Sequence, residues 1–250
     1  MRRSTIIIIL FLCYAMITVI RLTAPSDIDN RDQVKQGLYI LDVVQRGSFF
    51  LPVEHGHPST KPPLYTWVAA AISLVLGGVT DFTIRLPAVL SGLGVVLVTY
   101  LIAELLFSAK VGLIAGLILI LNYHFSDLSS IARTDMMQCF FISLSLHLFL
   151  LAYRKHQKKS ICSLLMFVAM GLGSITKSPV AFILPGLIVL IFLFLMKDLN
   201  WLKLMQIRAG IMVWLLIMLG WFIPAVLLGG HNYFDIVVID EMVNRFLGMG

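Results

Sequence analysis

Long apolar runs separated by short polar segments make up most of this chain. A helix needs about 20 apolar residues to cross a bilayer, and seven of the runs approach that length. We predict spanning helices at Thr5–Leu22, Pro87–Phe107, Val111–Phe125, Met136–Tyr153, Ile161–Ile175, Val180–Met196 and Ile207–Leu228. A further run, Leu64–Gly78, is short for a span and typical of a surface or re-entrant helix.

The basic residues indicate which loops face inward. The densest cluster lies within Arg154–Lys159, and Arg2 and Arg3 precede the first run. Since Lys and Arg favour cytoplasmic loops, both places are predicted inside. Both ends of the segment 26–87 are then outside, so Leu64–Gly78 does not cross. The loops Ser126–Asp135 and Thr176–Pro179 also fall outside.

The long polar segment from Thr23 to Pro87 contains a predicted amphipathic helix at Arg31–Arg46. Its apolar positions recur at helical spacing, and Gly47 is a plausible stop. We expect the apolar side of this helix to lie in the lipid boundary. That side consists of Val34, Leu38, Leu41 and Val44.

Composition excludes several classes of protein. With 59% hydrophobic and 13% charged residues, the chain cannot cover a soluble surface, and we predict an all-α polytopic membrane protein. The net charge of +6 fits basic inward loops rather than nucleic-acid binding, because no basic run is interleaved with aromatic residues. Cys13, Cys139 and Cys162 lie in apolar runs and do not suggest a disulfide framework.

Three outer-side residues are candidates for chemistry. Asp32 and Asp135 each open a predicted helix, and Lys61 stands at the bilayer surface before two prolines, where it could meet a lipid phosphate. Arg133 and Lys177 supply further cations in the outer loops. Helix capping by the two carboxylates and snorkelling by Lys61 are the structural alternatives.

Metal binding and hydrolysis have less support. Glu54, His55 and His57, with His124, match no closed zinc pattern. No Walker loop, GxSxG or HExxH pattern is present. We therefore predict no metal site from spacing.

Taken together, the polar motifs resemble those of the GT-C membrane glycosyltransferases, in the family of aminoarabinose transferases and dolichyl-phosphate-mannose–protein mannosyltransferases. The similarity runs through nearly the whole chain. In order, the motifs are Asn30-Arg31-Asp32-Gln33, Gly47-x-x-x-x-Pro52, Lys61-Pro62-Pro63-Leu64-Tyr65-x-Trp67, Arg85-Leu86-Pro87, Ala132-Arg133-x-Asp135-Met136, Thr176-Lys177-x-Pro179-Val180 and Asp240-Glu241-x-x-x-Arg245-Phe246.

The resemblance implies a GT-C helix bundle that moves a sugar from a polyprenyl-phosphate donor, with inversion, at the outer face of a bacterial inner membrane. The acceptor would be a lipid such as lipid A, a glycan or a protein. Asp32 would act as base or orient the acceptor, and Asp135 would be the acid of the second outer loop. The donor phosphate would bind Lys61, Arg133 and Lys177, and further substrate contacts would come from Tyr65, Arg85 and Arg245.

Some positions depart from the family pattern. Gln33 follows Asp32 where relatives carry Glu, and Thr60 replaces an acidic residue, so a divalent metal cofactor stays open. Met242 follows Glu241 where His is usual. We expect residues 1–25 to form the first span, 26–86 the outer loop with surface helices, 87–228 the later spans and 229–250 the start of another outer loop, with C-terminal helices and a soluble domain missing.

Two other functions are alternatives. A transporter or flippase of lipid-linked sugars would need ionisable groups at mid-membrane, whereas the charges here gather at one surface. A non-catalytic scaffold would not need Asp32, Lys61 and Asp135 on one side.

Overall fold

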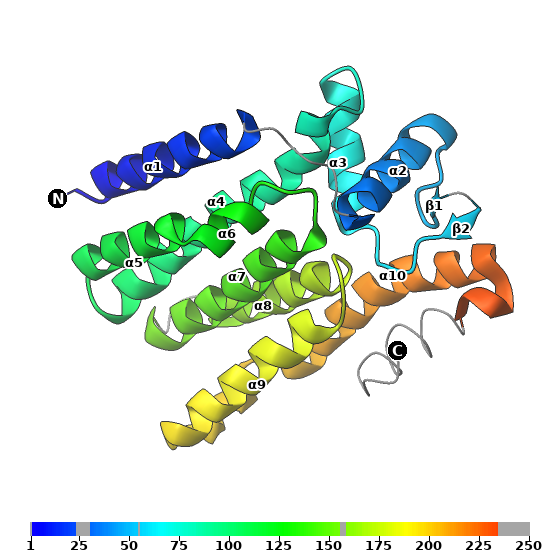
Figure 1. Ribbon diagram of the computed structural model, residues 1–250. Helices are drawn as coiled ribbons and strands as arrows, with labels where there is room; N and C mark the ends of the chain where they lie inside the picture. Colours follow the sequence, from blue (N-terminus) through cyan, green and yellow to red (C-terminus); the bar gives the residue numbers. More distant parts are fainter. Residues whose placement is uncertain (1, 24–30, 55, 156–158, 235–250) are drawn as a thin grey trace.

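The computed structural model describes residues 2–23, 31–54, 56–155 and 159–234. These residues form a helical bundle with one small hairpin (Figure 1). The helices are α1 (Arg3–Thr23), α2 (Arg31–Arg46), α3 (Leu64–Val75), α4 (Asp81–Leu106), α5 (Ala109–Leu121), α6 (Tyr123–Leu128), α7 (Thr134–Lys155), α8 (Lys159–Ser174), α9 (Val180–Leu195), the 3-10 helix η1 (Leu199–Leu204) and α10 (Ile207–Phe234). Strands β1 (Val53–Glu54) and β2 (His57–Pro58) pair antiparallel.

Four of the described helices are long and apolar enough to cross a membrane. They are α1, α4, α7 and α10. The helices α5, α8 and α9, which were also expected to span, have only 13, 16 and 16 residues. Since a helix rises about 1.5 Å per residue, these three are shorter than a bilayer core of about 30 Å. The structure therefore supports a multi-pass membrane protein, with four long apolar helices rather than seven.

Two helix boundaries differ from the expected ones for local reasons. The helix predicted to begin at Pro87 begins at Asp81, because Thr80 and Thr83 form a reciprocal capping box there. The run predicted to continue to Phe125 ends at Leu121, where Asn122 caps the separate helix α6 through a 3.0 Å bond to the backbone N–H of Phe125.

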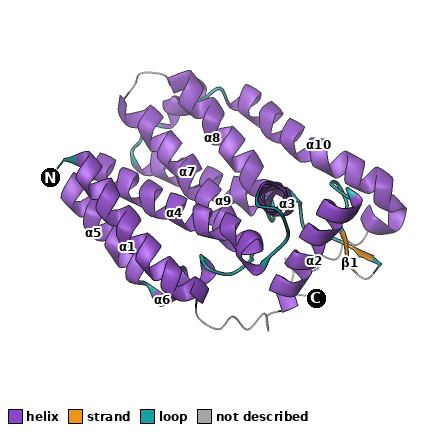
Figure 2. Ribbon diagram, turned by 90° about the horizontal axis from the view of Figure 1, so that it is seen from above, coloured by secondary structure: helices purple, strands orange, loops and turns teal. Residues whose placement is uncertain are grey.

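Helices α1, α4 and α5 lie side by side in both ribbon views (Figures 1 and 2). The hydroxyl of Tyr14 on α1 donates to the carbonyl of Val89 on α4 at 2.8 Å. A Cβ atom at Gly92 would collide with that hydroxyl, so glycine allows the close approach of α1 and α4. Near the other end of the same pair, Arg3 lies 3.2 Å from Glu104, which places the two helices antiparallel.

The short helices α2 and α3 and the hairpin gather at one end of the bundle (Figure 1). The predicted bounds of α2 are confirmed, and Gly47 ends it with a φ of 71°. The predicted apolar side is not the face that packs against the protein, since Val34 is 41% exposed. The buried positions are Gln33, Gln36, Ile40, Asp42 and Val43.

The reason lies in hydrogen bonds that hydrophobic periodicity does not reveal. Gln36 donates to Thr66 on α3 at 2.7 Å, and Asp42 accepts from the backbone N–H of Val53 at 2.9 Å. Each buried polar group has a partner, which offsets its desolvation. Helix α2 is therefore attached to α3 and to the hairpin through its polar residues.

Candidate functional site

Five charged side chains from separate segments come together at the end of the bundle that carries α2 and α3. We call them the charge cluster: Asp32, Lys61, Arg133, Asp135 and Lys177. They come from the first turn of α2, the turn before α3, the segment entering α7, the first turn of α7, and the turn between α8 and α9. Asp32 and Lys177, which are 145 positions apart in sequence (177 − 32), thus meet in one place.

Arg133 links the two carboxylates of the charge cluster. Its Nη2 lies 3.3 Å from Oδ2 of Asp32, and its Nε lies 3.3 Å from Oδ2 of Asp135. The ammonium of Lys177 donates to Oδ1 of Asp135 at 2.6 Å. The charge of Lys61 also acts on Asp135. Three cations facing two carboxylates leave one positive charge in excess, which suits an anion.

The linked side chains remain partly open to solvent. Arg133 and Asp135 are each 30% exposed, Lys177 is 33% exposed and Asp32 is 42% exposed. A ligand can therefore reach them without unfolding an element. Partial burial also strengthens electrostatic attraction relative to bulk water.

The turn that carries Lys177 is held on two sides. The side chain of Gln138 on α7 donates to the carbonyl and to the hydroxyl of Ser178, at 3.0 and 3.1 Å. The backbone N–H of Leu64 donates to the carbonyl of Ile175 at 3.1 Å. Because Leu64 follows the Lys-Pro-Pro turn, this bond brings the segments of Lys61 and Lys177 together.

Ser59 organises the backbone before Lys61. Its hydroxyl donates to the carbonyl of Lys61 at 3.0 Å, and its carbonyl accepts from the hydroxyl of Tyr233 on α10 at 2.9 Å. Burial raises the pKa of Tyr233 to about 12, so this phenol stays a neutral donor. Helix α10 thus supports the Lys61 turn from outside the charge cluster.

Two residues expected to contact substrate lie between helices. Tyr65 is fully buried, and its hydroxyl donates to the carbonyl of Ile84 on α4 at 2.8 Å. Arg85 is 4% exposed and lies 2.9 Å from Asp81. The Tyr65 hydrogen bond therefore joins α3 to α4, whereas the Arg85 ion pair lies within α4. Arg245, the third expected contact, lies outside the described residues.

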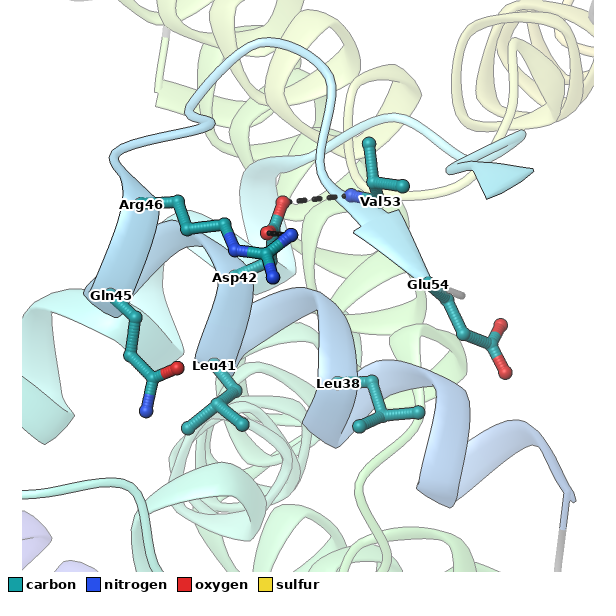
Figure 3. A pocket seen from close by; sticks show the side chains of 7 residues that line it. All are labelled: Leu38, Leu41, Asp42, Gln45, Arg46, Val53 and Glu54. Carbon is teal, nitrogen blue, oxygen red and sulfur yellow. Dashed lines mark hydrogen bonds and ion pairs between the residues drawn. The ribbon is translucent and has the colours of Figure 1, made fainter. Parts of the chain in front are cut away.

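A separate open hollow lies between α2 and β1 (Figure 3). Its lining includes Asp42 and Arg46, which are 3.5 Å apart, and Glu54, which lies 4.0 Å from Lys35. None of the charge cluster lines it. Within the described residues, no three His, Cys, Asp or Glu side chains gather as a metal site would require.

Sequence reasoning missed the residues that support the charge cluster. Gln138 is the clearest case, since a polar residue three positions after Asp135 on an apolar helix lies on the same face. The sequence motifs do not indicate the contact of Gln33, whose Oε1 accepts from the backbone N–H of Ala132 at 3.1 Å. Nothing in the sequence pointed to Tyr233 or Ser59.

The structure is that of a polytopic membrane protein with a charge cluster at one end of a helix bundle, and its fold is that of a GT-C glycosyltransferase. Residues 60–223 match the family model described as dolichyl-phosphate-mannose-protein mannosyltransferase, and the chain belongs to that family. Two uncharacterized proteins of Aquifex aeolicus are 30% and 28% identical to it over 210 residues. Each match covers 83% of this chain, but only 41% and 46% of the relative.

Solved structures agree on the fold. ArnT from Cupriavidus metallidurans, bound to undecaprenyl phosphate, superposes with a TM-score of 0.84 at 20% identity, over 97% of this chain and 45% of ArnT. The oligosaccharyltransferase of Archaeoglobus fulgidus gives a TM-score of 0.68 at 14% identity, over 99% of this chain and 35% of that enzyme. The chain therefore spans less than half the length of the relatives it matches.

Proposed function

We propose that this chain carries part of the active site of an enzyme that transfers a sugar from a polyprenyl-phosphate donor to an acceptor hydroxyl. The observation that carries the proposal is the ion network in which Arg133 joins Asp32 to Asp135 and Asp135 holds Lys177. Membership of a glycosyltransferase family gives the reaction class. The undecaprenyl phosphate bound to the related ArnT supports a polyprenyl-phosphate donor.

The chemistry divides between the cations and Asp32. Displacement at an anomeric carbon builds negative charge on the departing phosphate, and Lys61, Arg133 and Lys177 would stabilise it. Asp32 would accept the proton of the acceptor hydroxyl, which attacks the face opposite the phosphate and inverts the anomeric carbon. Asp135 holds Lys177 and Arg133 in place, and its role is to orient these cations.

The proposal includes a topology. The charge cluster would face the periplasm of a bacterial inner membrane, and Arg154 would lie on the cytoplasmic side. The shorter helices α5, α8 and α9 would complete seven crossings by local thinning of the bilayer. The donor would reach the charge cluster from the outer leaflet, and the acceptor would be a lipid, glycan or protein.

Variants of the full-length protein test this function. Purified wild-type protein should consume a polyprenyl-phosphate sugar and release polyprenyl phosphate, and Asp32→Ala, Lys61→Ala and Asp135→Ala should lose turnover at unchanged expression. Mass spectrometry of envelope glycolipids and glycoproteins, with and without the gene, would identify the acceptor. Normal transfer by all three variants would contradict the proposal. Movement of intact lipid-linked sugar across vesicles without cleavage would indicate a flippase instead.

A further inference from the structure

Two buried glutamines form hydrogen bonds with backbone segments that carry cations of the charge cluster. Gln33 accepts from the segment of Arg133, and Gln138 donates to the segment of Lys177. Gln33 on α2 is 5% exposed, and Gln138 on α7 is 9% exposed. A buried amide that reaches across to another backbone fixes the distance between two elements, because breaking the bond leaves unpaired polar groups. Neither residue is itself one of the charged groups.

Gln138 holds the segment of Lys177. Asp135 and Gln138 are three residues apart on α7 and therefore lie on one face. Asp135 accepts from the ammonium of Lys177 at 2.6 Å, while Gln138 donates twice to Ser178, the next residue in the chain. Residues on one face of α7 thus fix both the ammonium group of Lys177 and the backbone next to it.

Gln33 holds the segment of Arg133. Its Oε1 accepts from the backbone N–H of Ala132, the residue before Arg133, at 3.1 Å. In the chain, Asp32 comes directly before Gln33, and Arg133 comes directly after Ala132. The ion pair between Arg133 and Asp32 therefore lies beside this hydrogen bond. This hydrogen bond fixes the distance between α2 and the segment that enters α7.

We propose that the two glutamines are positioning residues with different main effects on the reaction. Gln138 sets Lys177 for the donor phosphate, and Gln33 sets the ion pair of Arg133 with Asp32, the group that deprotonates the acceptor. This inference rests on the proposed function. A misplacement of about 1 Å can cost on the order of 10²-fold in rate, so such bonds carry function as well as stability.

The two glutamines should respond differently to replacement by glutamate, because Gln33 accepts its hydrogen bond and Gln138 donates. Gln33 uses only its carbonyl oxygen in the bond to Ala132, so Gln33→Glu keeps an acceptor and Gln33→Leu loses it. Gln138 uses its N–H groups toward the carbonyl of Ser178, so neither Gln138→Glu nor Gln138→Leu restores that bond. The opposite responses to glutamate separate a hydrogen-bonding role from a packing role.

The experiment measures kcat, the donor KM and the melting temperature of the full-length protein in detergent. Gln138→Leu should raise the donor KM about tenfold, whereas Gln33→Leu should lower kcat about tenfold and raise the donor KM less, since Arg133 contributes to the phosphate site as well as to the ion pair with Asp32. In a Lys177→Ala background, Gln138→Leu should have no further effect on donor KM, because its influence passes through Lys177. Gln33→Leu should likewise add nothing to Arg133→Ala.

Tyr14→Phe is the matched control, since it removes one cross-helix hydrogen bond between α1 and α4 that involves no member of the charge cluster. It should lower the melting temperature and leave both kinetic constants unchanged. Equal kinetic losses in Tyr14→Phe and the glutamine variants would overturn the inference, as would additive effects in the double variants. If wild-type protein transfers no sugar, the proposed function fails. In that case binding of undecaprenyl phosphate, measured by thermal shift, still tests whether Gln138→Leu weakens the phosphate site.

Discussion

The two ends of the helix bundle both contain charged residues but use them differently. At the end away from α2, Glu104 lies 3.2 Å from Arg3 and accepts from the hydroxyl of Tyr100 at 2.6 Å, so its partners lie on α1 and on its own helix. At the other end, the ion pairs of the charge cluster connect segments before and within α7 to α2 and to the turn after α8.

The packing around these charges differs as well. Near the end of α7 that lies away from the charge cluster, Phe149 and Tyr153 contact Phe192 and Trp201, with ring centroids 5.3 to 5.7 Å apart. That end is closed by aromatic side chains. The charge cluster has no such cover in the part of the chain that the structure describes, and its ion-paired members are 30–42% exposed. One end is built for stability, and the other keeps cations within reach of a ligand.

The largest effect should come from Asp32→Asn. This change keeps the size of the side chain but removes the proton acceptor, and loss of a general base typically lowers kcat by about 10²–10⁴-fold. The measurement is release of polyprenyl phosphate by the full-length protein. Glu104→Gln is the matched change at the opposite end and should leave kcat within about threefold, since surface ion pairs contribute little. An equal loss of kcat in Asp32→Asn and Glu104→Gln would contradict the conclusion that only one end of the bundle takes part in catalysis.

Lys177→Ala should have the next largest effect. Removing one fixed donor to a developing anion costs on the order of 10²–10³-fold, so transfer should fall by that amount. Binding of undecaprenyl phosphate should weaken in parallel, as a titration by thermal shift would record. Arg154→Ala, at the opposite end of α7, serves as the comparison and should bind the lipid phosphate normally. Unchanged binding in Lys177→Ala would place the phosphate elsewhere.

The sequence predicted the helices well because apolar periodicity and caps act locally. The bounds of α2 and the start of the short α3 follow from spacing, from Gly47 and from the Pro-Pro turn before Leu64, although α3 ends at Val75 rather than at Gly78. The family motifs also indicated Asp32, Lys61 and Asp135 as members of one site. The structure places their segments together, while their chemical roles stay predictions.

What the sequence could not reveal are contacts that depend on tertiary pairing. The buried face of α2 is set by the hydrogen bonds of Gln33 and Gln36 to other elements, which the spacing of its apolar residues does not indicate. The link between the Lys61 and Lys177 segments is a backbone bond from Leu64 to Ile175, which no side-chain pattern encodes. Helix capping and ligand binding at Asp135 also look alike until Lys177 is seen beside it.

A smaller effect is expected from Arg133→Lys. Lysine keeps the positive charge but lacks the planar fork with which Arg133 contacts two carboxylates at once. We expect kcat to fall about tenfold, between the wild type and Arg133→Ala, because only one of the two contacts can be kept. Steady-state kinetics of the three proteins would show this order. A Lys variant as active as the wild type would mean that charge alone matters there.

The smallest effect should come from Tyr65→Phe, which asks whether this residue belongs to the site or to the scaffold. Its hydroxyl is buried on the carbonyl of Ile84, and burial raises its pKa, so it acts as a neutral donor between α3 and α4. Losing one such bond costs about 1 kcal/mol, which should lower the melting temperature by a few degrees. The donor and acceptor KM values should not change, because a fully buried phenol offers a substrate no surface. A clear rise in either KM would mean that Tyr65 contacts substrate, as the family motif implied. Ser73→Ala removes another hydrogen bond between α3 and α4 and serves as the control. It would show whether loosening this helix pair is enough to raise the KM.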